Sequence, residues 1–425
     1  MYLIKNNPLF IFELLYLLIP ITLVFSIAIS ELFLIIIVIF FIIYTIKHKI
    51  FFYYKNQLFL LFIVFCIYLI LVSLIKNKEV PISVLFFFRF GLFALATWLL
   101  LDNNKNLIKL MLISIFITCS IVSADTIFQY LFGTNLIGYK YDVVAQPRMS
   151  GLFNNELILG SYLSRFSPLI FLQLGFFIQK TKTFSLLRII MVSTFLFFFS
   201  SVIFASGERV AFIYFMLSLI FFIIFLNSKK NSFLIIIACI IGFFFINSGG
   251  ESRLIKTTVL QIQGSFNSLD DGTSKLKNFS SIPIVHLHHW KSTVLMAKEN
   301  IFFGVGPRMF RIECKNPKYS VPNGCATHPH NIYFQLLGEA GIFGFIFLFS
   351  FFFFILKTII TELRKRTSFL SDKKAPVICF SLFCLFLHFF PLLPNGNFFN
   401  NWLNIITFLP MGIFLHSSHK KVSHD

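Results

Sequence analysis

Residues 57–75, QLFLLFIVFCIYLILVSLI, form an apolar run that contains no charged side chain. An α-helix of about 20 apolar residues spans the roughly 30 Å hydrocarbon core of a bilayer. Similar runs recur along the chain, and none alternates polar and apolar residues as the strands of a transmembrane barrel do. Because lipid offers no partners for backbone N–H and C=O groups, such runs must be helices. The sequence therefore predicts an all-α, polytopic membrane protein.

The composition of the whole chain supports this prediction. Of the 425 residues, 57% are hydrophobic and only 12% are charged, whereas a soluble protein has about 25% charged residues. Dividing the chain into apolar runs of spanning length predicts about 12 transmembrane helices. Their expected limits are 9–28, 31–46, 57–75, 82–101, 107–130, 151–179, 185–206, 210–226, 232–248, 332–357, 376–394 and 401–416.

The positive charges predict the orientation of these helices. If both termini are cytoplasmic, the short loops rich in lysine and arginine all lie on the cytoplasmic side, as the positive-inside rule requires. These loops lie near residues 47–55, 105–109, 180–188, 229–230 and 364–374. A formal net charge of +19 would suggest nucleic acid as the partner of a soluble protein. Here the charge sets topology, and we expect no nucleic acid.

Residues 249–330 form a long polar segment that this orientation places outside the cytoplasm. A loop of that length is expected to have a function of its own. It contains an apolar-periodic stretch at 290–301, which predicts a helix, followed by the turn Gly304-Val305-Gly306-Pro307. We therefore predict a bundle of about nine transmembrane helices at 1–248, a mostly helical loop at 249–330, and about three helices with a cytoplasmic tail at 331–425.

Two cysteines, Cys314 and Cys325, lie in this loop, while the other five lie inside apolar runs. A free cysteine in an apolar run packs as a small apolar side chain. A disulfide between the two loop cysteines requires an oxidising compartment. The pair is therefore a test of the predicted orientation.

The strongest chemical pattern is Thr327-His328-Pro329-His330-Asn331, at the point where the loop re-enters the membrane. A neutral histidine accepts a proton from a hydroxyl near neutral pH, because its unperturbed pKa is about 6.5. The pattern therefore offers candidates for proton transfer and substrate binding. An alternative is that these side chains only cap a helix or form hydrogen bonds within the loop.

A second pattern is Ser206-Gly207-Glu208-Arg209, a tight outer turn between two predicted spans. The planar guanidinium of Arg209 suits a phosphate group. The alternative is that Arg209 extends to the membrane interface beside Glu208. Arg148 lies at another outer boundary and is a candidate for contact with a polar headgroup.

Arg89, Asp125, Glu156 and Arg165 lie within or near predicted spans. Such groups usually face the interior of a bundle or a cavity. They can pair with one another, Glu156 with Arg165 or Asp125 with Arg89, or they can form the midplane site of a solute transporter. Transporters often contain inverted repeats, and the sequence shows none.

His286, His288 and His289 raise the question of a metal. Their spacing does not match the i, i+4 pair of helical zinc sites, and we predict no metal. The sequence also contains no Walker loop and no dinucleotide fingerprint, and we expect no cofactor.

Three motifs follow one another from the loop into the next span. They are a Trp-containing helix with His289-Trp290, the turn from Gly304 to Phe310 with the pattern Gly-x-Gly-x-x-x-Phe, and His330-Asn331-Ile332-Tyr333-Phe334-Gln335 running into Glu339-Ala340-Gly341-Ile342-Phe343-Gly344. Together they resemble the O-antigen ligase and polymerase superfamily of bacterial envelope enzymes. The number of spans, Arg209 in an outer turn before the loop, and the closing stretch from Pro394 to Trp402 agree with this resemblance.

The resemblance implies a GT-C-like glycosyltransferase of the bacterial inner (plasma) membrane with a periplasmic active site. An O-antigen ligase moves a glycan from an undecaprenyl diphosphate carrier to lipid A-core in lipopolysaccharide assembly. The lipid diphosphate is already an activated leaving group, so the transfer needs no metal. Arg209 would neutralise the diphosphate. His330 would accept the proton of the acceptor hydroxyl, a contribution of about 10²–10⁴-fold, and His328 and Asn331 would contact substrate.

The sequence departs from the family pattern at one position. Members usually have a second arginine a few residues before the loop tryptophan, and His286 stands there instead. Either His286 contacts the diphosphate, or Arg253, Arg308 or Arg311 reaches it. The nearest alternative activity is that of an O-antigen polymerase, whose acceptor is a second lipid-linked repeat. A purely structural scaffold would leave the polar loop residues without a role.

Overall fold

The structure is a computed structural model that describes residues 9–77, 79–140, 148–178, 186–226, 229–247, 284–365 and 374–419. Within these residues the chain is helical, and the β-structure is a single isolated bridge between Thr134 and Lys140. The predicted all-α class is confirmed.

Each of the twelve predicted spans coincides with a helix. These helices are α2 (Phe10–Phe25), α3 (Ile27–Lys47), α4 (Gln57–Asn77), α6 (Arg89–Asn103, preceded by α5, Ile82–Leu85), α7 (Leu107–Phe132), α8 (Leu159–Ile178), α9 (Leu186–Ala205), α10 (Arg209–Phe225), α11 (Lys229–Asn247), α15 (Ile332–Arg364), α16 (Lys374–His388) and α17 (Asn401–Ser418). Among the described residues, seven helical segments are long and apolar enough to cross a membrane. The chain is therefore a polytopic membrane protein, and the remaining predicted spans are shorter or less apolar helices.

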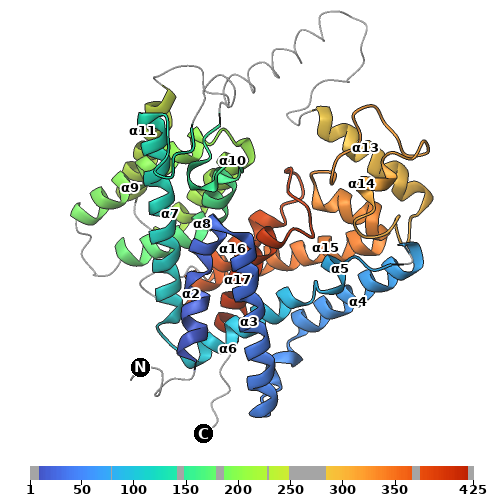
Figure 1. Ribbon diagram of the computed structural model, residues 1–425. Coiled ribbons are helices and arrows are strands. Elements are labelled where there is room, and N and C mark those ends of the chain that lie inside the picture. Colours follow the sequence, from blue (N-terminus) through green and yellow to red (C-terminus); the bar gives the residue numbers. More distant parts are fainter. Residues whose placement is uncertain are drawn as a thin grey trace, which may run out of the picture.

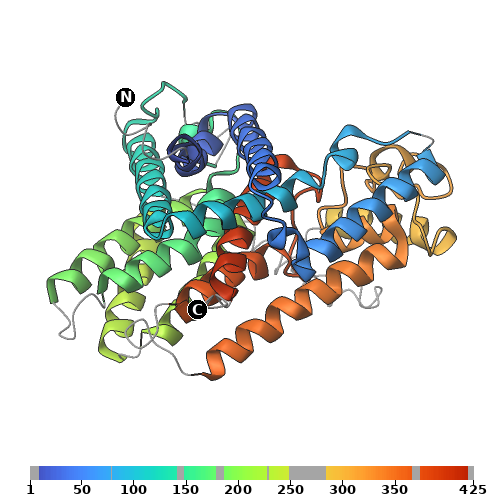
Figure 2. The same cartoon turned by 90° about the horizontal axis from the view of Figure 1, so that it is seen from below.

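The helices form a central group with two flanks. In Figures 1 and 2, α9, α10 and α11 lie on one side of α2, α16 and α17, while α4, α13 and α15 lie on the other side. Helix α17 packs against α6 and α16, and α10 packs against α8. The first turn of α2 and the last turn of α17 lie at the same end of the bundle (Figure 1).

The outward faces of these helices are apolar. Large side chains on α3, α4 and α10 are more than half exposed, including Ile43 at 60%, Val64 at 63% and Ile224 at 60%. Soluble monomers rarely expose large contiguous apolar surfaces, but hydrocarbon tails solvate them without cost. This surface agrees with a bundle that folds in lipid.

Two predicted spans have limits that the structure corrects. Helix α8 begins at Leu159 instead of 151, because Gly151 and Asn154 have left-handed φ values of 52° and 59°. Helix α16 ends at His388 instead of 394, and the chain then forms a loop that contains Pro391 and Pro394. Proline has no N–H to donate and is disfavoured in a helix interior.

The polar loop contains α13 (Ile284–Glu299) and α14 (Phe310–Glu313), which pack against the start of α15. The predicted helix at 290–301 is therefore found, although it begins earlier. Met296, Phe310, Cys314 and Tyr319 form a small core of their own. Cys314 and Cys325 are joined by a disulfide, with Cα atoms 5.2 Å apart.

A glycine turn attaches this small domain to a broken helix. Gly341 interrupts α15 with φ +70°, and the carbonyls exposed just before the break accept bonds from the turn. The Val305 N–H donates to Gly338 O at 2.8 Å and the Gly306 N–H donates to Glu339 O at 2.9 Å. Gly304, with φ +64°, lies so close to the Gly338 carbonyl that a side chain would collide with it. The Gly-x-Gly motif thus fixes the loop to α15.

Candidate functional site

Four histidines gather where the loop meets the bundle. His286 and His289 lie one turn apart on α13, and His328 and His330 lie in the segment that leads into α15. The ring centroid of His330 is 4.2 Å from that of His328, 4.8 Å from His286 and 5.3 Å from His289. The predicted residues His286, His328 and His330 are therefore brought together, and His289 joins them.

The backbone around His330 is held from two sides. The indole N–H of Trp290 donates to Pro329 O at 3.0 Å, and the same ring stacks on Phe334 at 4.7 Å. From the bundle, the Asn395 N–H donates to the His330 carbonyl at 2.8 Å. His330 itself has φ 56°, a left-handed conformation that is uncommon outside glycine and clusters at functional sites.

Burial keeps the imidazoles of this cluster neutral. Burial is the main cause that lowers the pKa of His330 to about 3 and that of His328 to about 4. The neighbouring histidines lower both values further, since two positive rings repel each other. Burial also lowers the pKa of His286, and the charges of His289 and Arg209 add to this effect.

Arg209 lies on α10, which is on the other side of the central helices from α13 (Figure 1). It is the first residue of α10 and follows the turn in which Gly207 has φ 67°. After burial and the charge of His289, the positive charge of Arg209 is a further cause that lowers the pKa of His286. The two predicted catalytic residues, Arg209 and His330, therefore both interact electrostatically with His286, although they are far apart in sequence.

The other predicted site residues make contacts within the protein. Arg148 fastens the turn that carries Arg209, because its Nη2 donates to Leu157 O at 2.9 Å and lies 3.4 Å from Glu208 Oε1. Arg308 donates to Ser83 Oγ at 2.6 Å. Their predicted contacts with substrate stay predictions. Arg253 lies outside the described residues.

Asn331 has the contacts of a helix N-cap. It is 1% exposed, and its Oδ1 accepts hydrogen bonds from the N–H groups of Tyr333 and Phe334 at 2.9 and 3.3 Å. Its Nδ2 donates to Pro391 O at 2.9 Å. These bonds orient the first turn of α15 directly after His330, so Asn331 reaches a substrate only if some of them are exchanged.

A buried arginine supports the site from within the bundle. Arg165 on α8 donates to Asn395 Oδ1 at 2.7 Å, and its Nη1 lies 3.1 Å from His388 Nδ1. Asn395 therefore links this cation to the backbone of His330. The pairings that the sequence suggested are not the ones formed, because Arg89 pairs with Glu31 and Asp125 accepts from the Leu136 N–H.

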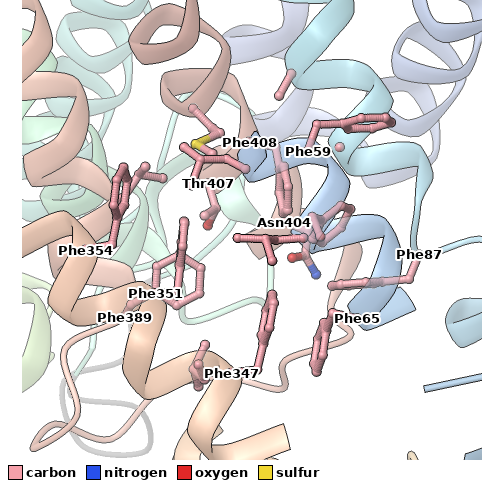
Figure 3. A pocket seen from close by; sticks show the side chains of 18 of the residues that line it. Phe59, Phe65, Phe87, Phe347, Phe351, Phe354, Phe389, Asn404, Thr407 and Phe408 are labelled. Atoms are coloured by element: carbon pink, nitrogen blue, oxygen red, sulfur yellow. The ribbon is translucent and has the colours of Figure 1, made fainter. Parts of the chain in front are cut away.

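An apolar cavity of about 310 Å³ lies between α4, α6, α15 and α17 (Figure 3). Its lining is mostly apolar, and ten of the 21 lining residues are phenylalanines, among them Phe65, Phe347 and Phe398. The N–H of Phe398 donates to Gln335 Oε1 at 2.9 Å, one turn after the histidine segment. The cavity is therefore in contact with the segment that positions His330, and its lining suits a hydrocarbon chain.

Comparison with known families adds a decisive observation. The sequence profile of a family described as O-antigen ligase matches residues 194–349. This part of the chain is similar to the O-antigen ligase family, and the match supports the O-antigen ligase and polymerase superfamily. The match includes Arg209, α13, the glycine turn, the histidine segment and Gly341, so it covers the resemblance that the motifs predicted. No protein among the curated ones compared matches the chain.

Proposed function

We propose that this protein belongs to the O-antigen ligase family and transfers a glycan from an undecaprenyl diphosphate carrier to lipid A-core. The main observation behind the proposal is that the neutral His330 lies next to His286. The charge of Arg209 is one of the causes that lower the pKa of His286. This observation supports a proton acceptor and a permanent cation that act in one site. The apolar cavity between α4, α6, α15 and α17 agrees with a lipid-linked donor.

The proposed transfer requires two chemical functions of the protein, deprotonation of the acceptor and stabilisation of the leaving group. The acceptor hydroxyl loses its proton while its oxygen forms a bond to the anomeric carbon, and the bond from that carbon to the diphosphate oxygen breaks. His330 accepts the proton, and Arg209 stabilises the charge that grows on the departing diphosphate. A bound diphosphate also raises the low pKa of His330, because a nearby negative charge favours the imidazolium. No metal is needed in this transfer.

The acceptor distinguishes a ligase from a polymerase. Purified protein is incubated with an undecaprenyl-diphosphate-linked glycan and with either lipid A-core or a second molecule of donor. We expect labelled glycan on lipid A-core only, detected after separation of the lipid products. Labelled glycan found only as an elongated, carrier-linked chain would make the protein a polymerase and overturn the ligase assignment.

We place the site on the periplasmic face of the bacterial inner membrane, with both chain termini in the cytoplasm. The disulfide between Cys314 and Cys325 supports this, because disulfides persist in the periplasm and are rare in the cytoplasm. The ends of α2 and α17 also lie at one end of the bundle. If cells are treated with a thiol reagent before lysis and the protein is then digested without reductant, we expect these two cysteines to be linked. Finding both alkylated would contradict the proposed sidedness.

A further inference from the structure

Three of the clustered histidines have the arrangement of metal ligands. The side-chain nitrogens that His286, His289 and His330 can offer all lie within 4.8 Å of one another. Two ligands come from adjacent turns of α13 and the third comes from a different segment, held in place by Trp290 and Asn395. Three histidines with a fourth position open to water or substrate are a frequent zinc site in proteins.

The hydrogen bonding of these rings also indicates a missing partner. The Nδ1 atoms of His286 and His289 are buried and have no hydrogen-bond partner among the described residues, and the same is true of the neighbouring His288, which is not one of the three clustered histidines. Buried polar atoms in folded proteins nearly always have a partner, and exceptions are often explained by an ion or a water. No side chain of the described residues forms a hydrogen bond to the Nδ1 atoms of His286 and His289, so such a bond need not be broken when an ion binds there.

We propose that His286, His289 and His330 bind one divalent transition metal ion of the Zn²⁺ class, and that this ion inhibits the transfer. Imidazole nitrogen prefers Zn²⁺, Co²⁺, Ni²⁺ and Cu²⁺ to hard cations such as Mg²⁺. A tetrahedral ion with Zn–N bonds of about 2.0 Å needs nitrogens about 3.3 Å apart. Binding therefore requires that the three rings rotate and bring these nitrogens closer together than the 4.8 Å of this structure.

The inhibition rests on the proposed function, in which a lone pair of His330 accepts the proton of the acceptor hydroxyl. A ring nitrogen of His330 that is bound to the ion cannot accept a proton from the acceptor hydroxyl. The metal and the reaction therefore compete for the same imidazole. The binding itself does not depend on which reaction the protein catalyses.

Adjacent histidines of α13 supply a matched pair of variants. His289 belongs to the cluster, whereas His288 lies next to it in sequence and is not one of the three ligands. Even the loss of an outer-shell partner weakens metal binding by about 10–100-fold. We therefore expect His289→Gln, which removes a ligand, to weaken binding at least about 10-fold and His288→Gln to leave it unchanged.

The test uses the purified full-length chain in detergent after treatment with a chelator. Co²⁺ is titrated and binding is followed by its visible absorption, with Zn²⁺ as competitor and Mg²⁺ as the control ion. We expect one Co²⁺ per chain in the unsubstituted protein and in His288→Gln. Equal binding by the two variants, or no saturable binding by the unsubstituted protein, would overturn the proposal.

A second measurement avoids dependence on a variant that does not fold. In the unsubstituted protein, Zn²⁺ should protect His286, His289 and His330, and not His288, from modification by diethylpyrocarbonate, as mapped by mass spectrometry. Equal modification with and without Zn²⁺ would count against the site.

The consequence for the reaction is tested separately. Zn²⁺ should inhibit transfer by the unsubstituted protein, and His289→Gln should need at least about 10-fold more Zn²⁺ for the same inhibition. Unaltered transfer in the presence of bound metal would overturn the inhibition but not the binding. Absence of any transfer by unsubstituted protein would contradict the proposed function, while the Co²⁺ titration would still decide the metal site.

Discussion

Replacing His330 by asparagine is expected to reduce transfer at least about 100-fold, since a positioned general base contributes about 10²–10⁴-fold. Asparagine is a better test than alanine, because it adopts the left-handed backbone conformation of His330, φ 56°, more readily. The variant therefore removes the imidazole and leaves the segment between Pro329 and Asn331 in place. The initial rate of glycan transfer at saturating donor measures the effect.

Two controls separate loss of the base from loss of the fold. The His288→Asn variant changes a neighbouring histidine outside the group of three that includes His330 and should retain transfer. Both variants should elute as the unsubstituted protein does in size exclusion and should unfold at similar temperatures. A folded His330→Asn protein that transfers glycan at the normal rate would show that another group accepts the proton.

Replacing Arg209 by alanine is expected to reduce transfer by about 10²–10³-fold, the usual effect of removing one group that stabilises transition-state charge. Arg209→Lys should recover part of the rate. Lysine keeps the positive charge but lacks the planar pair of donors that fits a phosphate group. The loss should appear in kcat more than in donor affinity, because the charge on the diphosphate grows as the bond breaks.

Arg364 supplies the matched control for this series. It is an exposed arginine in the last turn of α15, far along that helix from the histidine segment. Arg364→Ala removes the same charge from the chain without changing the site, so it should leave transfer unaltered. Equal rates in Arg209→Ala and Arg364→Ala would remove Arg209 from the proposed mechanism.

Sequence reasoning was most successful where the physical signal is local. Apolar runs of spanning length gave helices at all twelve predicted places, because lipid permits few other structures for such runs. The glycines at 304 and 306 indicated a turn, and both have positive φ in the structure. The motifs also predicted the family that the profile match supports.

Contacts between residues that are far apart in the sequence could not be predicted from local patterns. Asn395 lies in a stretch close to the end of a predicted span, and nothing in that stretch indicates that its N–H bonds His330. Pairing with Glu156 was one alternative for Arg165, but its partners Asn395 and His388 are more than 200 residues away in the sequence. His289 was weighed only with the histidines beside it, and its closeness to His330 depends on how α13 packs on α15. Proline at 391 and 394 was the available sign that this segment leaves the helix.

We propose that His330 acts in the site where the bond between a glycan and its lipid diphosphate carrier breaks. A single-turnover reaction tests it most directly, with purified protein, a donor labelled in both glycan and lipid, and lipid A-core. For the unsubstituted protein we predict that free undecaprenyl diphosphate and glycan-bearing lipid A-core appear at the same rate and in equal amounts, and that neither appears with His330→Asn. Equal rates of both products with folded His330→Asn would contradict the account.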